Sequence, residues 1–132
     1  MSVATEEPAG PPSLFDVLRG DGGGAPAGYL REDVRFRSPY ADYHGRDDVR
    51  HLAGLIAQVL TDVEASRRVV DGRCTLTVLH ARVGERSIEG VLCEDHDGDG
   101  RLADSMLVLR PLDALRAAID RMRARLAEAP LP

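Results

Sequence analysis

The chain has 132 residues, enough for one domain with a single hydrophobic core and no need of disulfides or metal ions. It carries 17 Lys and Arg against 22 Asp and Glu, a formal net charge of −5, and every basic residue is arginine. Nucleic-acid-binding proteins concentrate positive charge on one face, so this balance argues against DNA or RNA as a partner. No apolar run approaches the roughly 18 residues of a membrane span, and the acidic start MSVATEEPAG lacks a secretory-signal pattern. We therefore expect a cytoplasmic protein with no membrane partner.

The N-terminal region divides into a tail and the start of the domain. Residues 1–12 are small, acidic and proline-rich, a composition that predicts a disordered tail. The single domain is expected over residues 13–128. Ser13 can cap a short helix over 13–19, and the glycine-rich segment 20–28 predicts a flexible loop.

The next segment predicts a short hairpin and a helix. Apolar or small residues alternate with arginines over 34–38, the pattern of a half-buried strand, and Pro39 interrupts it. A second short strand is expected over 40–44. From Asp47 to Val59 apolar residues recur every three to four positions, which predicts a helix that packs on a sheet.

The second half of the chain predicts a meander followed by a helix. Three strand-like runs cover 73–83, 87–95 and 102–110, separated by Gly84-Glu85 and by a turn over 97–100, so antiparallel neighbours are expected. A helix begins at Pro111, with apolar residues spaced by three and four. The order of elements predicts an α+β domain with a curved antiparallel sheet wrapped on helices.

Two groups of residues in the sequence are candidates for metal sites. Asp95, Asp97 and Asp99 begin segment 95–106 like a calcium loop, but Met106 stands where a bidentate Glu should close the site. The segment therefore predicts a hairpin turn without metal. Cys74 and Cys93 lie in predicted strands without CxxC or Cys/His spacing, which favours buried free thiols over a disulfide or a metal site.

The register of the predicted hairpin over 73–83 and 87–95 determines which side chains lie on each face of the sheet. If Gly84 and Glu85 form a two-residue turn, His80 stands opposite Glu89. A His–Glu pair can move protons, but several other charges share this face, which favours a polar outer surface or a dimer surface. The opposite face carries apolar residues such as Leu79 and Leu92 and should look onto the helices and a cavity.

Two segments resemble a known family. YLREDVRFRSPYADYHG at 29–45, followed by an amphipathic helix, and EGVLCEDHDGDGRLADSMLVLRPLDAL at 89–115 resemble the nuclear transport factor 2-like (NTF2-like) domain of bacteria. SnoaL-type polyketide cyclases, ketosteroid isomerase and limonene epoxide hydrolase share that fold. The resemblance spans about residues 28–126 and implies a cone-shaped pocket between the curved sheet and the helices, as in NTF2-like and cystatin-like folds.

The family carries many chemistries as well as none, so function must be argued from the pocket. The resemblance places Leu92 where many SnoaL-like enzymes present a carboxylate, which weakens the case for an acid/base site. We therefore expect a small-molecule-binding protein, non-catalytic or weakly catalytic, that needs no cofactor, binds a small apolar metabolite and forms a homodimer through the sheet. The expected ligand-binding residues are Phe36, Ser38, Leu55, Val59, Thr77, Leu79, Leu92, Leu107 and Leu109.

The alternative is an enzyme of secondary metabolism, a cofactor-independent cyclase, isomerase or epoxide hydrolase. Its candidate catalytic residues are Tyr40 and His44, a phenol and an imidazole close together in the first hairpin. Such a pair can polarise a carbonyl or move a proton in a closed apolar pocket. The pocket lining discriminates the two hypotheses, because an enzyme needs a titratable group inside and a binding protein does not.

Overall fold

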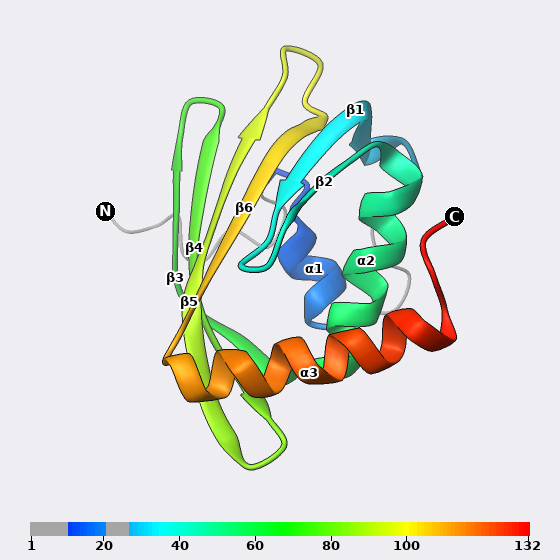
Figure 1. Cartoon of the computed structure of the whole chain (residues 1–132). Coiled ribbons are helices and arrows are strands. Elements are labelled where there is room, and N and C mark those ends of the chain that lie inside the picture. The colour runs from blue at the N-terminus through cyan, green and yellow to red at the C-terminus, as the bar shows by residue number, and fades with distance from the viewer. Residues whose placement is uncertain (1–10, 21–26) are drawn as a thin grey trace.

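A computed structural model of the chain describes residues 11–20 and 27–132. One six-stranded sheet carries helices on one face, and the C-terminal helix crosses its lower end (Figure 1). Most of the predicted tail and of the predicted glycine-rich loop, at 1–10 and 21–26, lies outside the described residues. Within the described part, no helix has the length and apolar character needed to cross a membrane.

The first elements of the fold agree with the predicted hairpin and helix. Helix α1 (Leu14–Leu18) starts at Ser13, whose Oγ accepts a hydrogen bond of 3.0 Å from the Phe15 N–H, as the capping pattern predicts. A 3₁₀ turn (Ala27–Tyr29) leads into β1 (Leu30–Arg37), which pairs antiparallel with β2 (Asp42–His44). Helix α2 (Arg46–Val59) then turns its apolar stripe to the core.

The second half of the chain forms a four-stranded meander and a long helix. The strands are β3 (Thr61–Asp71), β4 (Cys74–Val83), β5 (Arg86–His96) and β6 (Leu102–Arg110), and α3 (Leu112–Glu128) follows. The spatial order is β2-β1-β6-β5-β4-β3. The α+β class and the curved sheet are confirmed. The sheet is mixed rather than purely antiparallel, because β1 lies parallel to β6.

The predicted β4–β5 register is confirmed residue by residue. Gly84 and Glu85 form the two-residue turn, and Gly84 takes the positive φ of 61° that such a turn requires. His80 stands opposite Glu89 on the outer face, and both side chains are exposed. On the other face Leu79 and Leu92 are fully buried against the helices.

Strand β3 was missed by the sequence analysis. It lies at one edge of the sheet and pairs only with β4, with register shifts at two places. Val63 is its one buried side chain. Its sequence TDVEASRRVVD accordingly shows no regular alternation of apolar and polar residues. An edge strand that is largely exposed to solvent does not need the pattern by which buried strands are recognised.

The helices and the sheet enclose one hydrophobic core. α1 and α2 lie side by side over the sheet, and α3 crosses below them (Figure 1). Near its C-terminal end α3 is tied to α2 where His51 Nε2 lies 2.6 Å from the Ala129 carbonyl oxygen. These contacts fix the space between α2, α3 and the sheet, where the candidate site lies.

Candidate functional site

An apolar cavity of about 70 Å³ opens between the β1–β2 turn, α2, β6 and α3. Aliphatic side chains from both helices and from β6 form most of its wall. Its lining consists of Ser38, Pro39, Tyr40, Tyr43, Leu52, Ile56, Val59, Leu60, Leu107, Leu109, Leu115, Ala118, Ile119, Met122, Arg123 and Leu126. No carboxylate and no imidazole lines this cavity within the described residues.

The polar groups of the cavity lie at the β1–β2 turn and on α3. The Ser38 hydroxyl is used by the turn itself, because it donates to the Ala41 carbonyl at 2.8 Å and accepts from two backbone N–H groups. Tyr40 is 58% exposed, and the guanidinium of Arg123 lies over its ring at 5.3 Å from the centroid. Burial raises the pKa of the half-buried Tyr43, with the nearby Tyr40 adding to the shift, so its hydroxyl stays protonated.

The structure brings about half of the predicted site residues to this cavity. Those that line it are Ser38, Tyr40, Val59, Leu107 and Leu109. Phe36, Thr77, Leu79 and Leu92 are instead fully buried on the inner sheet face and are not among the residues that line it. Leu55 is buried on α2 but neither lines the cavity nor belongs to the main core cluster.

The two candidate catalytic residues are not brought together at the cavity. Successive residues of β1 and β2 point alternately to the inner and the outer face of the sheet. The paired residues Phe36 and Tyr43 point to the core. His44 pairs with Arg35 and is exposed, and it is not part of the lining. Tyr40 lines the cavity, and none of the described lining residues is a histidine.

A second polar group of residues lies deeper, beneath α1. The Glu94 carboxylate is completely buried on the inner sheet face and accepts hydrogen bonds from the Ser13 hydroxyl, from the Leu14 N–H at 3.0 Å and from the Ser105 hydroxyl at 3.0 Å. Both oxygens are therefore satisfied by protein donors. This arrangement holds α1 on the sheet and covers the carboxylate.

The surroundings of Glu94 favour its neutral form. Burial raises the pKa of Glu94 above its usual value, although the hydrogen bonds from Ser13, Leu14 and Ser105 and the nearby His96 act in the opposite direction. Tyr29 is also buried nearby, and burial together with the charge of Glu94 raises its pKa. His96 is held by the backbone, with Nε2 at 2.6 Å from the Pro12 carbonyl oxygen.

Sequence analysis missed Glu94, although the signal was present. Glu94 follows Leu92 by two positions in a predicted strand, so the period of two places it on the same inner face. An acidic residue at a position predicted to face the core needs buried donors, and Ser13 and Ser105 provide them.

The acidic segment after β5 forms a turn in the structure. In the turn after β5, Asp97 Oδ1 accepts backbone hydrogen bonds of 2.9 Å from Asp99 and Arg101, which confirms the hairpin turn. Among the described residues no group of three or more His, Cys, Asp and Glu side chains is placed to hold a metal ion. Cys74 and Cys93 are free thiols, half-buried on the outer face rather than fully buried.

Comparison with solved structures identifies the family. A steroid delta-isomerase from Pseudomonas aeruginosa is 32% identical with a TM-score of 0.76, and the match covers 87% of this chain and 84% of the other. An uncharacterised bacterial protein with a cystatin-like fold from Silicibacter pomeroyi is 30% identical with a TM-score of 0.80, covering 86% and 81%. An NTF2-like protein of unknown function from Cytophaga hutchinsonii shares the fold at 11% identity, with a TM-score of 0.63 and coverage of 77% and 88%.

These similarities, together with the curved sheet and its cavity, define the class: the chain belongs to the NTF2-like (SnoaL-like) family. A scan against protein-family models finds no match, and a search of curated proteins finds none either. The predicted family is therefore confirmed by the solved structures.

Proposed function

We propose that the protein binds a small, mostly apolar molecule in the cavity between α2, α3, β6 and the β1–β2 turn. The lining carries this proposal, because it is mostly aliphatic and, within the described residues, contains no carboxylate or imidazole. Pockets that bind apolar ligands are lined in this way, with a few polar groups that fix orientation. No cofactor is required by such a function.

The size of the cavity limits the ligand. Its volume of about 70 Å³ is roughly half of the 150 Å³ apolar cavity that is known to hold benzene. The cavity therefore takes a short aliphatic group, or the end of a longer molecule whose remainder lies outside the mouth at Tyr40 and Arg123. Met122 in the lining has an unbranched, flexible side chain that can adapt to a slightly larger group.

A cavity-filling substitution tests the proposal. In Ala118→Leu the added carbons occupy the space that the ligand would take, since Ala118 lines the cavity and is buried. Binding of 1-hexanol as a probe, followed by chemical-shift changes of cavity methyl groups, should be lost in this variant. Ala124→Leu, which changes an exposed residue of the same helix outside the lining, should bind like the parent. Equal binding by both variants would contradict the proposal.

A second candidate function is a cofactor-independent enzyme, favoured by the 32% identity to a protein described as a steroid delta-isomerase. A steroid's fused rings are several times the size of benzene and exceed this cavity as it stands. Catalysis would depend on Tyr40 and His44, and His44 lies off the lining. Comparing turnover of the parent with Tyr40→Phe and His44→Ala tests this candidate, and no turnover in the parent would favour the binding protein.

We also propose that the protein is a homodimer that associates through the outer sheet face. This face combines exposed Val69 and Val108 with half-buried Leu76, Val78 and Val91, an apolar area with polar neighbours. Val108 is 52% exposed, so Val108→Arg should leave the fold intact and place unpaired charges in the interface. Light scattering at about 50 µM, well above the dissociation constant of an obligate dimer, should show a dimer for the parent and a monomer for the variant. A monomeric parent would contradict the proposal.

A further inference from the structure

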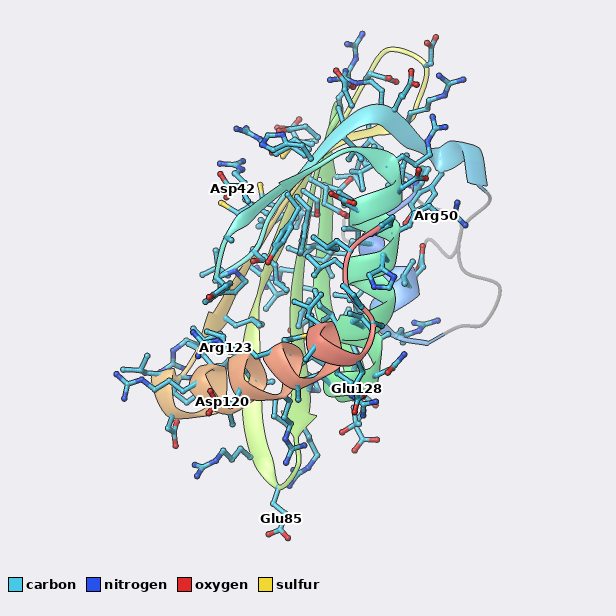
Figure 2. The ribbon with its side chains drawn as sticks, turned by 45° about the vertical axis from the view of Figure 1, so that its right-hand side comes forward. Asp42, Arg50, Glu85, Asp120, Arg123 and Glu128 are labelled. Atoms are coloured by element: carbon cyan, nitrogen blue, oxygen red, sulfur yellow. The ribbon has the colours of Figure 1, made fainter. Side chains whose placement is uncertain are left out.

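The mouth of the cavity holds a cation, Arg123, that has no carboxylate partner among the described residues. The Arg123 guanidinium lies over the Tyr40 ring and its Nη2 is 3.4 Å from the Tyr40 hydroxyl oxygen. Figure 2 shows Arg123 on α3, on the side that faces the β1–β2 turn. Arg123 is the one charged side chain among the described residues of the lining.

Some of the other described arginines have carboxylate partners. Arg35 and Arg37 share Asp104, and Arg86 is paired with Asp113. No ion pair within residues 11–20 and 27–132 involves Arg123. Stacking on Tyr40 uses the flat face of the guanidinium, so most of the N–H donors on its edge are left for another acceptor.

The cavity is polar at this end only. The Tyr40 hydroxyl lies beside Arg123, Tyr43 is a further hydroxyl-bearing residue of the lining, and the Ser38 hydroxyl is already used by its own turn. The other side chains of the lining are apolar. A ligand that satisfies this lining has one anionic end at the mouth and an apolar remainder inside.

We propose that the cavity binds a small amphipathic monocarboxylate, with its short aliphatic tail between α2 and α3 and its carboxylate on Arg123 at the mouth. This inference rests on the proposed binding function and names its ligand class. A carboxylate matches the guanidinium fork and accepts two parallel hydrogen bonds from it. The Tyr40 hydroxyl is a further donor beside it. A dicarboxylate would bury its second charge among aliphatic side chains without a partner.

Binding of three probes with the same tail tests the proposal at low ionic strength: hexanoate, 1-hexanol and hexylammonium. Hexanoate should bind the parent about fivefold more tightly than 1-hexanol, since a partly exposed charged hydrogen bond contributes on the order of 1 kcal/mol. Hexylammonium should bind most weakly, because Arg123 repels it. Arg123→Gln should bring hexanoate to the affinity of 1-hexanol and leave 1-hexanol unchanged, with Tm preserved because Arg123 is exposed. Arg123→Lys should retain part of the preference.

Arg116→Gln is the matched control, because it removes the same charge from an exposed position of α3 outside the lining. If it weakens hexanoate as much as Arg123→Gln does, only long-range attraction is at work and the proposal is overturned. If hexanoate binds no more tightly than 1-hexanol, the carboxylate preference is wrong while the proposed binding function stands. If neither probe binds, both fail.

Discussion

The backbone N–H of Leu14 donates a hydrogen bond of 3.0 Å to Glu94 Oε2, across a sequence separation of 80 residues. The Ser13 hydroxyl donates to the other oxygen, and the Ser105 hydroxyl reaches Oε2 at 3.0 Å. One buried carboxylate thus connects the start of α1, strand β5 and strand β6. Because α1 has only five residues, its position depends on such tertiary contacts rather than on intrinsic helix stability.

Removing the Glu94 carboxylate should destabilise the protein strongly. Glu94→Ala leaves three buried donors without an acceptor, and each costs on the order of 1 kcal/mol or more, so we expect a loss of about 3 kcal/mol in the free energy of unfolding. Glu94→Gln keeps one acceptor oxygen and should lose less. Urea denaturation measures both, with Glu89→Ala on the exposed outer face as the control. A Glu94→Ala variant within about 0.5 kcal/mol of the parent would contradict this role.

The same carboxylate should make stability depend on pH. The pKa of Glu94 is raised by burial above its usual 4.5, so between 4.5 and the folded-state pKa the folded protein binds more protons than the unfolded chain. The free energy of unfolding therefore falls as pH rises through that window and is restored as pH falls back toward 4.5.

Glu94→Gln isolates this effect, because it lacks the titrating group and keeps His96 and Tyr29. Denaturation curves of parent and variant between pH 4.5 and neutrality should give a difference in stability that shifts in favour of the parent as pH falls. A difference that stays constant would mean that folding does not change the titration of Glu94.

The sequence predicted the parts of the fold in which apolar spacing is regular. The turn at Gly84-Glu85 and the alternation in β4 and β5 fixed which residues pair and which face each occupies. Strand β3 lacks this pattern because its side chains are mostly exposed. The parallel pairing of β1 with β6 depends on contacts between distant segments, such as Arg35 with Asp104, that no local pattern contains.

The candidate site could be predicted only in part, because its lining also depends on contacts between segments that are distant in the sequence. Aliphatic positions on β6 and α2 could be placed on the inner face, but their periodicity does not reveal which of them α3 leaves uncovered. Arg123 is an exposed residue of α3 outside its apolar stripe, and its position over Tyr40 follows from how α3 crosses the sheet. Tyr40 and His44 are close in sequence, yet strand alternation turns His44 to the outer face.

Gly90 allows β5 and β6 to approach closely, which leads to a prediction about packing. A Cβ at Gly90 would lie 1.8 Å from the Val108 carbonyl oxygen and 2.9 Å from Leu109 Cδ2, so a side chain there forces the strands apart. Gly90→Ala should lower the free energy of unfolding by about 2 kcal/mol or more. Gly54→Ala is the control, because nothing lies within 4 Å of its Cβ position in α2, and it should stabilise by up to about 1 kcal/mol. Similar Tm values for the two variants would refute the close-approach argument.

Two ion pairs on Asp104 connect β1 with β6. The Asp104 carboxylate accepts hydrogen bonds from Arg35 Nε at 2.8 Å and from Arg37 Nη2 at 2.7 Å. Partial burial acts to raise the pKa of Asp104, but the hydrogen bonds and charges of the two arginines outweigh it and lower the pKa below 3.8. A carboxyl with a lowered pKa contributes stability above its unfolded-state value, and that contribution is lost as pH falls through the folded-state pKa.

Asp104→Asn should therefore cost about 1 kcal/mol at neutral pH, a modest figure because both arginine side chains are at least a third exposed to solvent. The cost should shrink as the pH is lowered below 3.8, where the parent also loses its charge. Chemical denaturation at neutral and acidic pH measures both values, and Asp99→Asn in the exposed turn controls for net charge. A cost that is the same at both pH values would show that hydrogen-bond geometry rather than charge holds β1 to β6.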